Sequence, residues 1–243
     1  MHLTTDAIIC SARHHSEHGV IARLLTPDDG LLAGYVRGGR STRMRPILIP
    51  GNSVSATLRS RSEDQLASLS VELTHSRGPL LSEPLAAAAI DWASTLTSAS
   101  LPEGQAFPQI YSALSGLLAA IELSPAARGW AAALARYELL LLQSLGFGLA
   151  LDCCTVTGST QDLAFVSPKS AAAVSRAAAS GYEARLLPLP AFLLDGSMAT
   201  LEQALDGLRM SGHFIETRLF DTRRDTLLAV RERLIDRLQR AIT

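Results

Sequence analysis

The stretch that decides the fold is Tyr35-Val-Arg-Gly-Gly-Arg-Ser-Thr-Arg-Met-Arg-Pro46. Before it, Leu31–Val36 is an apolar run typical of a strand, and after it Ser53–Leu58 alternates as a half-buried strand does. From Gly30 to Ser62 the chain carries six arginines and no acidic residue, although the net charge of the whole chain is only −1. A positive field confined to one strand–loop–strand unit indicates a surface that binds a polyanion. A basic loop that only faces solvent is the alternative.

Turn signals such as Pro27-Asp-Asp-Gly30 divide the first part of the chain into short strands. Five such strands, joined by turns and one longer basic loop, predict a small closed barrel. The OB-fold is the common case, and it binds single strands across its middle strands and flanking loops. The expected strands are Thr5–Arg13, Val20–Thr26, Leu31–Val36, Val54–Leu58 and Leu66–Leu73.

From Pro84 onward the apolar period changes from two residues to about 3.6, which predicts helices. The helix expected at Ala126–Leu145 is apolar nearly all round, so we expect it to be the buried axis of a bundle. The last helix presents an arginine face, which is more often solvated than bound to a ligand. The expected helices are Leu85–Leu96, Phe107–Ile121, Ala126–Leu145, Ala199–Arg209, Phe214–Phe220 and Arg224–Ile242.

An irregular segment, residues 151–187, interrupts the helical part of the chain. It contains a hairpin-like segment at Leu163–Val166 and a helix of small residues expected near Ser170–Ala179. The predicted fold class is therefore α+β in three parts. Residues 1–80 form a five-stranded OB-fold barrel, residues 81–150 and 188–243 form a helical domain, and residues 151–187 form an insert.

Composition excludes several classes of protein. No apolar run reaches the roughly 18–20 residues that span a bilayer, and the first residues lack the basic-then-apolar order of a signal peptide. Three cysteines, two of them adjacent, imply no disulfide framework. We therefore expect a soluble, cytoplasmic protein of a reducing compartment.

Catalytic and metal chemistry find little support in the sequence. His14, His15 and His18 lie in a connection, and Cys10 offers no partner at ligand spacing. Ser11 with these histidines and the pair Glu63-Asp64 are the candidates for an enzyme, but no nucleophile elbow, phosphate loop or metal-binding helix occurs. We expect a binding protein that is not an enzyme. A protein-docking scaffold whose barrel binds no nucleic acid remains the alternative.

Seven segments, in this order and spacing, resemble the RecO family of bacterial recombination mediators along nearly the whole chain. None is diagnostic alone, but together they are specific. They are Gly19–Gly30, Val36–Arg43, Ile49–Asn52, Leu58–Ser62, Arg136–Gly148, Cys154–Gly158 and Phe165–Pro168.

The resemblance implies an N-terminal OB-fold, a helical domain and an insert like a zinc ribbon. It also implies a protein that binds single- and double-stranded DNA, anneals complementary strands, and works with RecR to load RecA onto strands coated by single-strand-binding protein. Many relatives carry four zinc cysteines in the insert. Cys154 matches the first position, but Gly158 follows Thr157 where a second would stand, and Ser175 lies where the second pair should be. We expect no zinc and no cofactor, and an insert held by packing around Phe165, Val166 and Leu186.

Two candidate sites follow. For the nucleic acid, we expect Arg37, Arg40 and Arg43 to contact phosphates, with Arg45, Arg59 and Arg61 as lesser contributors. By resemblance, the helical domain captures the acidic, apolar C-terminal tail of single-strand-binding protein, which requires a hydrophobic slot with a cation at its mouth. Between Leu81 and Ala150 the only cations are Arg128 and Arg136. We expect Arg136, with Arg128, to receive the tail beside Leu140; the alternative is that Arg136 pairs with a nearby acid.

Overall fold

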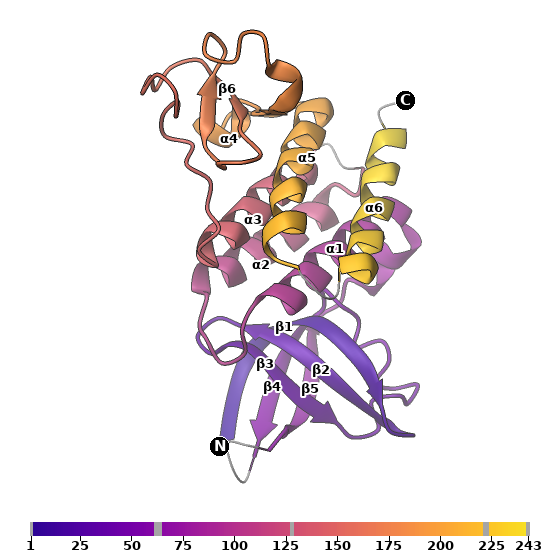
Figure 1. Ribbon diagram of the computed structural model, residues 1–243. Helices are drawn as coiled ribbons and strands as arrows, with labels where there is room; N and C mark the ends of the chain where they lie inside the picture. The colour runs from indigo at the N-terminus through magenta and orange to yellow at the C-terminus, as the bar shows by residue number, and fades with distance from the viewer. Residues whose placement is uncertain (1, 61–64, 127–128, 221–223, 242–243) are drawn as a thin grey trace. The chain divides into compact units, whose positions relative to one another are not determined.

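The computed structural model describes residues 2–60, 65–126, 129–220 and 224–241 of the chain (Figure 1). Contacts divide the chain into two compact units, residues 1–125 and 126–243. The first unit holds the barrel together with two helices that we expected to belong to a separate helical domain. The predicted domain boundaries at residues 80, 150 and 187 stay predictions.

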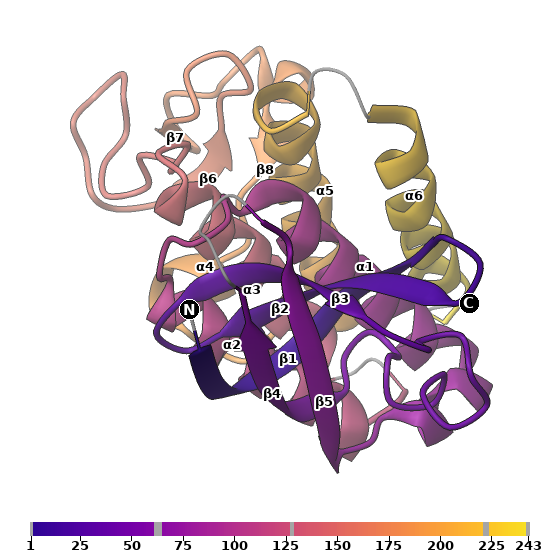
Figure 2. The ribbon, with the colours of Figure 1, turned by 90° about the horizontal axis from the view of Figure 1, so that it is seen from below.

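The first unit is built on a closed five-stranded barrel, seen from below in Figure 2. The strand order around it is β1-β2-β3-β5-β4, and β3 and β5 pair in parallel while the other pairs are antiparallel. This confirms the predicted OB-like barrel. The strands are β1 His2–His15, β2 Gly19–Thr26, β3 Gly30–Val36, β4 Ser53–Arg59 and β5 Ala67–His75.

The barrel closes around a core made by alternation along each strand. In β5, for example, Ala67, Leu69 and Val71 are buried, while Ser68 and Ser70 between them are exposed. Because successive side chains of a strand point to opposite faces, this pattern places one set inside the barrel and one set on its surface. The interior is filled mainly by Val, Leu, Ile and Ala side chains.

Two helices pack on the barrel within the same unit: α1 Pro84–Ser100 and α2 Pro108–Leu123, preceded by the short helix η1 Gly78–Ser82. Gly51 shows how closely α1 approaches, because a Cβ there would lie 2.6 Å from Ile90. The buried Arg77 donates a hydrogen bond to the Gly51 carbonyl oxygen (2.6 Å) and pairs with Glu122 of α2 at 3.6 Å. These contacts fix the strand that follows the basic loop.

In the second unit, α3 Trp130–Ser144 packs against α5 Leu201–Arg218, and α6 Arg224–Arg240 packs against α5. Trp130, Leu134, Tyr137 and Leu141 of α3 are buried, as expected for the axis of the bundle. The predicted break between Arg209 and Phe214 is wrong, since α5 runs through it without interruption. Gly212, within the expected break, leaves room for Arg231 of α6. A Cβ at this position would lie only 2.4 Å from the Arg231 guanidinium.

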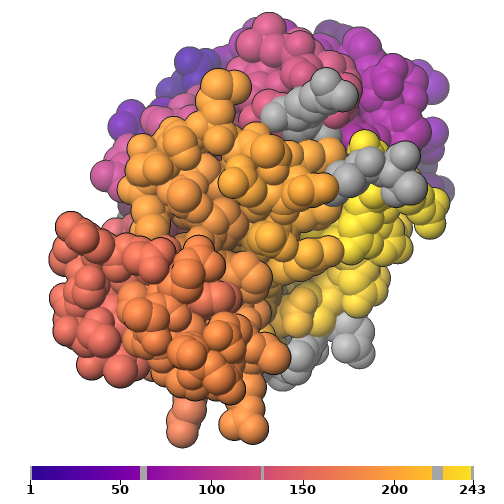
Figure 3. All heavy atoms as spheres, turned by 90° about the horizontal axis from the view of Figure 1, so that it is seen from above, coloured from indigo at the N-terminus to yellow at the C-terminus, as the bar shows by residue number. Residues whose placement is uncertain are grey.

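The insert contains a small three-stranded sheet of order β7-β6-β8. Figure 3 shows the insert beside the segment that contains α5, with α6 on the far side of that segment. The hairpin-like segment expected at Leu163–Val166 forms a single strand, β6, which pairs with β7. The helix expected near Ser170–Ala179 is wrong, because residues 173–175 pair with β6 instead. Ala171 also has a positive φ of 56°, which ends any helix there. The remaining elements are β7 Ala173–Ser175, η2 Glu183–Arg185, β8 Leu187–Pro188 and α4 Phe192–Asp195.

Candidate nucleic-acid interface

Residues 37–52, here called the basic connection, join β3 to β4 and form a compact series of turns. Backbone hydrogen bonds run from Arg45 N to Ser41 O (3.0 Å) and from Leu48 N to Met44 O (3.1 Å). The buried Asn52 amide donates to Pro46 O (2.8 Å) and Ile47 O (3.1 Å). Met44 and Ile47 pack on the core of the barrel. The basic connection is therefore held in one conformation by its own hydrogen bonds and by apolar packing.

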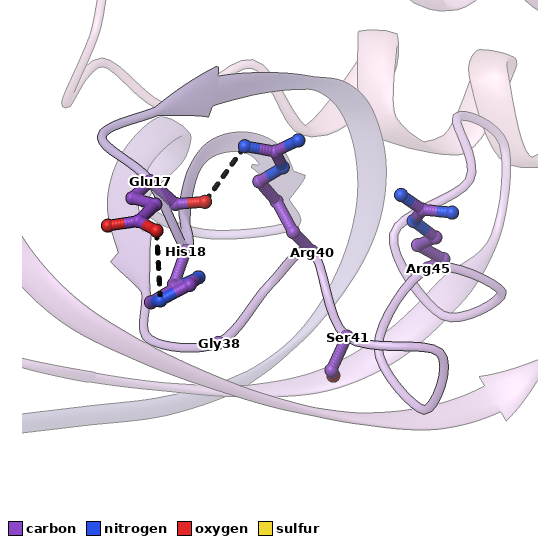
Figure 4. Close-up of a pocket in the computed structure, with 6 residues that line it drawn as sticks. All are labelled: Glu17, His18, Gly38, Arg40, Ser41 and Arg45. Carbon is purple, nitrogen blue, oxygen red and sulfur yellow. Dashed lines mark hydrogen bonds and ion pairs between the residues drawn. The ribbon is translucent and has the colours of Figure 1, made fainter.

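The basic connection presents four exposed arginines. Arg40 donates from Nη1 to the Glu17 carbonyl oxygen at 2.8 Å, which ties it to the β1–β2 turn (Figure 4). Among the described residues, the guanidinium groups of Arg37, Arg43 and Arg45 make no hydrogen bond or ion pair. Three positive charges on a fixed piece of backbone are therefore available to an external anion.

Arg59 reaches the same side of the barrel by strand register. Tyr35 of β3 pairs with Ser68 of β5, and Ser68 pairs with Arg59 of β4. Residues directly opposite each other on neighbouring strands point to the same face, and two strand spacings amount to about 10 Å. Arg59 therefore shares a row with Tyr35, the residue two before Arg37. Arg61, the last arginine of the predicted set, lies outside the described residues.

Two hollows flank the basic connection. The first, of about 470 Å³, is lined by Arg40 and Arg45 together with Glu17 and His18 of the β1–β2 turn (Figure 4). The second, of about 480 Å³, is here called the slot. It has Met44, Ile47, Val71 and Leu73 as its apolar floor and Arg37 and Arg43 at its rim.

The middle strands of the barrel are less accessible than the sequence suggested. Arg23 of β2 donates to the Ser98 carbonyl oxygen and forms an ion pair with Glu103 at 2.8 Å. Gly104 N donates to the Leu31 carbonyl oxygen of β3 at 3.0 Å. The segment between α1 and α2 therefore covers one end of β2 and β3 and neutralises the cation on β2.

The residues weighed for catalysis or metal binding are separated by the structure. Burial raises the pKa of the Cys10 thiol to about 12, so that it carries no charge at neutral pH. The hydroxyl groups of Ser11 and Ser98 share a hydrogen bond of 3.0 Å. The His15 ring lies edge-on to the Tyr35 ring, with 6.1 Å between the ring centres. The described residues contain no group of three or more His, Cys, Asp and Glu side chains placed to hold a metal ion. Glu63 and Asp64 lie outside those residues.

The insert does not carry the donor set of a structural zinc site around Cys154. Ser175 N donates to Cys154 Sγ at 3.3 Å, and Gly158 N donates to the Cys154 carbonyl oxygen at 2.8 Å. The Thr157 hydroxyl, followed by the hydroxyl and amide of Ser175, holds the pKa of the Cys154 thiol down at about 6. One sulfur among hydroxyl groups does not fit a tetrahedral structural zinc site, which takes four Cys or His ligands. The expected absence of zinc stays a prediction.

The predicted tail site rests on α3. Arg136 Nη2 donates to the Phe192 and Ser197 carbonyl oxygens at 3.1 and 3.0 Å, and its guanidinium lies 5.1 Å from the centre of the Phe192 ring. Leu140, four residues later on the same face of the helix, is half-buried. Arg136 therefore packs against the α4 region instead of pairing with an acid. Arg128 lies outside the described residues, and the tail site stays a prediction.

Sequence reasoning missed one cluster entirely. Glu138 is fully buried in the apolar stripe of α3 and pairs with Arg231 of α6 at 3.1 Å. Ser211 of α5 donates its hydroxyl to the same carboxylate. The sequence did offer a signal, because Glu138 directly precedes a run of four leucines in a helix expected to be buried. A buried carboxylate is costly unless it is paired, so such a position predicts a buried partner. The cluster joins three helices of the second unit and serves structure.

Comparison with known proteins gives the family context. The family described as "Recombination protein O N terminal" matches residues 1–77, and "Recombination protein O C terminal" matches residues 81–227. A DNA repair protein RecO of Rhodospirillum rubrum is 44% identical over 240 residues, covering 96% of this chain and 94% of the relative. Another, from Rhodospirillum centenum, is 41% identical and covers 100% and 97%. No helix in the described parts of the chain has the length and apolar character to cross a membrane.

Proposed function

Because this chain belongs to the RecO family and so has a role in DNA repair and recombination, we propose that it acts by binding DNA through the basic connection of its barrel. The observation that carries this proposal is the set of three exposed arginines, Arg37, Arg43 and Arg45, that have no internal partner among the described residues. Phosphate groups are the complementary ligand, since arginine binds them by paired, charge-assisted hydrogen bonds.

The arginines have unequal parts in the proposed interface. Arg40 donates one hydrogen bond to the Glu17 carbonyl oxygen, which holds the β1–β2 turn. The carbonyl is neutral, so the positive charge of Arg40 can still bind a phosphate. Arg59 extends the interface along the barrel through its register with Ser68 and Tyr35. Arg61 remains part of the proposal from the sequence alone.

The finer steps of the function come from the family resemblance. We propose that the protein binds both single- and double-stranded DNA, anneals complementary strands, and works with RecR to load RecA onto strands coated by single-strand-binding protein. It does so in the cytoplasm, at the nucleoid, by binding and without a catalytic step. Phosphate contacts carry no sequence information, which suits an annealing protein because it must accept any sequence.

The proposed partner site on the second unit is Arg136 with Leu140. The Arg136 guanidinium lies over the Phe192 ring, and its Nη2 donates hydrogen bonds to two carbonyl oxygens that hold it there. Nε and Nη1 make no hydrogen bond with the described residues, so both can donate to a carboxylate of the acidic tail of single-strand-binding protein. Hydrogen bonds from Ser197, and to a lesser extent the charge of Arg136, lower the pKa of Asp195. A carboxylate of the tail would compete with Asp195 for the charge of Arg136.

A salt titration of DNA binding tests the proposal. Labelled single-stranded DNA is titrated at several salt concentrations with wild type and with Arg37→Ala plus Arg43→Ala, and anisotropy is recorded. Each lost phosphate contact lowers the slope of log K against log salt by about 0.7 on a single strand. We therefore expect the double variant to lose about 1.4 from the slope and most of its affinity at moderate salt.

A matched control separates local charge from net charge. Arg176→Ala and Arg185→Ala together also remove two exposed arginines, but from the insert. This control should keep the wild-type slope. If both double variants lose the same slope, or neither does, the basic connection is not the DNA site. If wild type binds no DNA at any salt concentration, the protein-docking scaffold becomes the better reading of the barrel.

A further inference from the structure

We propose that the slot beside the basic connection receives one unpaired nucleobase of a single strand, while the neighbouring phosphates contact Arg37 and Arg43. The inference rests on the proposed DNA binding and adds to it a second kind of contact, apolar instead of electrostatic. It also gives the barrel a reason to prefer single strands, which phosphate contacts alone do not.

The floor of the slot is an opening of the barrel's own core. Val71 and Leu73 of β5 share the inward side of the strand, but exposure rises from 8% at Val71 to 40% at Leu73, where the barrel ends. Met44 and Ile47 of the basic connection pack against the same core and line the slot opposite β5. A single exposed leucine is ordinary on a protein surface. Here the exposed leucine instead lies in a hollow together with three further apolar side chains.

The rim of the slot supplies charge. Arg37 and Arg43 both line it, both are exposed, and neither guanidinium has a partner among the described residues. Its volume of about 480 Å³ lies within the range of small-ligand sites, roughly 300–1,000 Å³. A nucleotide matches this combination, because it joins a flat base with apolar faces to a phosphate on each side.

The occupant could instead be an acidic, apolar peptide, and two observations favour the nucleic acid. The exposed Glu72 also lines the slot, and its carboxylate would repel an acidic peptide, whereas the N3–H of thymine or the amino group of another base can donate to it. The hollow on the other side of the connection shares Gly38 and Ser41 with the slot and adds Arg40 and Arg45. The positive charge thus continues past the slot, as a chain of phosphates requires.

Duplex DNA cannot fill the slot in the same way. Its bases are stacked and paired, so a base can enter an apolar pocket only after it has been extruded from the helix, which costs free energy. A duplex therefore keeps the phosphate contacts and loses the apolar one. The slot predicts tighter binding of a single strand than of a duplex at equal salt concentration.

The test removes the base from the DNA and the apolar side chain from the protein. Wild type and Leu73→Ala are titrated with a labelled oligothymidylate and with a strand of equal length made of abasic nucleotides. Leu81→Ala is the matched control, because Leu81 is a leucine of the same unit that is 51% exposed, lies in η1 and does not line the slot. Thermal melting verifies that both variants fold.

We expect wild type to bind the oligothymidylate about tenfold more tightly than the abasic strand, as one stacked or buried base contributes. Leu73→Ala should lose about three- to tenfold on the oligothymidylate and nothing on the abasic strand. Leu81→Ala should match wild type on both.

Other results overturn the inference. If wild type binds both strands equally, or if Leu73→Ala weakens both equally, the slot holds no base, while the proposed DNA binding stands. If an acidic, apolar peptide competes for the slot and Leu73→Ala weakens only that peptide, the slot is a protein site. Absence of binding to either strand refutes the proposed function itself.

Discussion

The buried pair Glu138–Arg231 and the surface pair Asp206–Arg209 allow a direct measurement of what burial does to an ion pair in this protein. The two pairs have almost equal lengths, 3.1 and 3.0 Å. Their side chains differ in exposure: 8% and 0% for Arg231 and Glu138, against 54% and 37% for Arg209 and Asp206. Distance therefore cannot explain any difference in their contribution to stability.

The expected magnitudes follow from the environment. At an effective dielectric constant of 20 the buried pair attracts with about 5 kcal/mol, whereas the surface pair in water attracts with about 1.4 kcal/mol before screening. Removing Arg231 also takes its guanidinium away from a fully buried carboxylate. We therefore expect Arg231→Ala to lower the free energy of unfolding by about 3–5 kcal/mol, and Arg209→Ala to lower it by less than about 1 kcal/mol.

The assay is urea unfolding followed by tryptophan fluorescence. The chain has two tryptophans, so a Trp92→Phe background leaves Trp130 of α3 as the reporter of the second unit. Glu138→Gln combined with Arg231→Met should recover part of the loss, because it removes both charges at once. A loss with Arg231→Ala no larger than with Arg209→Ala would refute the reasoning and show that water reaches the Glu138 carboxylate.

Three more predictions concern the second unit. Wild type should contain no stoichiometric zinc by elemental analysis. The triple variant Thr157→Cys, Ser175→Cys and Ala178→Cys should bind about one zinc per chain, because it supplies four cysteines together with Cys154. Stoichiometric zinc in wild type would contradict the conclusion that its side chains do not form a zinc site. The pKa of the Cys154 thiol is about 6, against about 9 for a free thiol. Its ionisation should therefore contribute in full to the free energy of unfolding above pH 9, and this contribution should be lost as the pH falls to 6. If the free energy of unfolding depends on pH over this window as strongly in Cys154→Ser as in wild type, the prediction is wrong. Arg136→Ala should weaken binding of an acidic, apolar tail peptide about tenfold by titration, and equal affinities place the tail pocket elsewhere.

The sequence predicted the barrel well because each of its strands is set locally. Alternation along β5 and the turn at Pro27-Asp-Asp-Gly30 both specify structure within a few residues. The same locality explains the correct position of the basic connection. Its four arginines follow a glycine pair between two strands, and no distant contact is needed to put them on the surface.

The errors lie where distant contacts decide. Ser211-Gly212 has the composition of a helix end, but the glycine is there to admit the Arg231 guanidinium from another helix. The small residues near Ser175 suit a helix by propensity, yet the amides of β7 pair with β6, and tertiary context overrides propensity. Neither partner is adjacent in the sequence, so no local pattern could have revealed it.

In the insert, apolar packing surrounds the one sulfur that matches the zinc-ligand pattern. Cys154, Val174 and Ala179 form a small buried cluster, with Phe165 and Leu186 packed against it. Around the one remaining sulfur, the Ser175 amide and the Thr157 hydroxyl supply hydrogen bonds at positions where a zinc site needs further thiolates. Apolar packing and hydrogen bonds to the Cys154 thiol therefore hold this part of the insert together. Because those hydrogen bonds favour the thiolate and hold the pKa of Cys154 down, we expect their contribution to weaken as the pH falls.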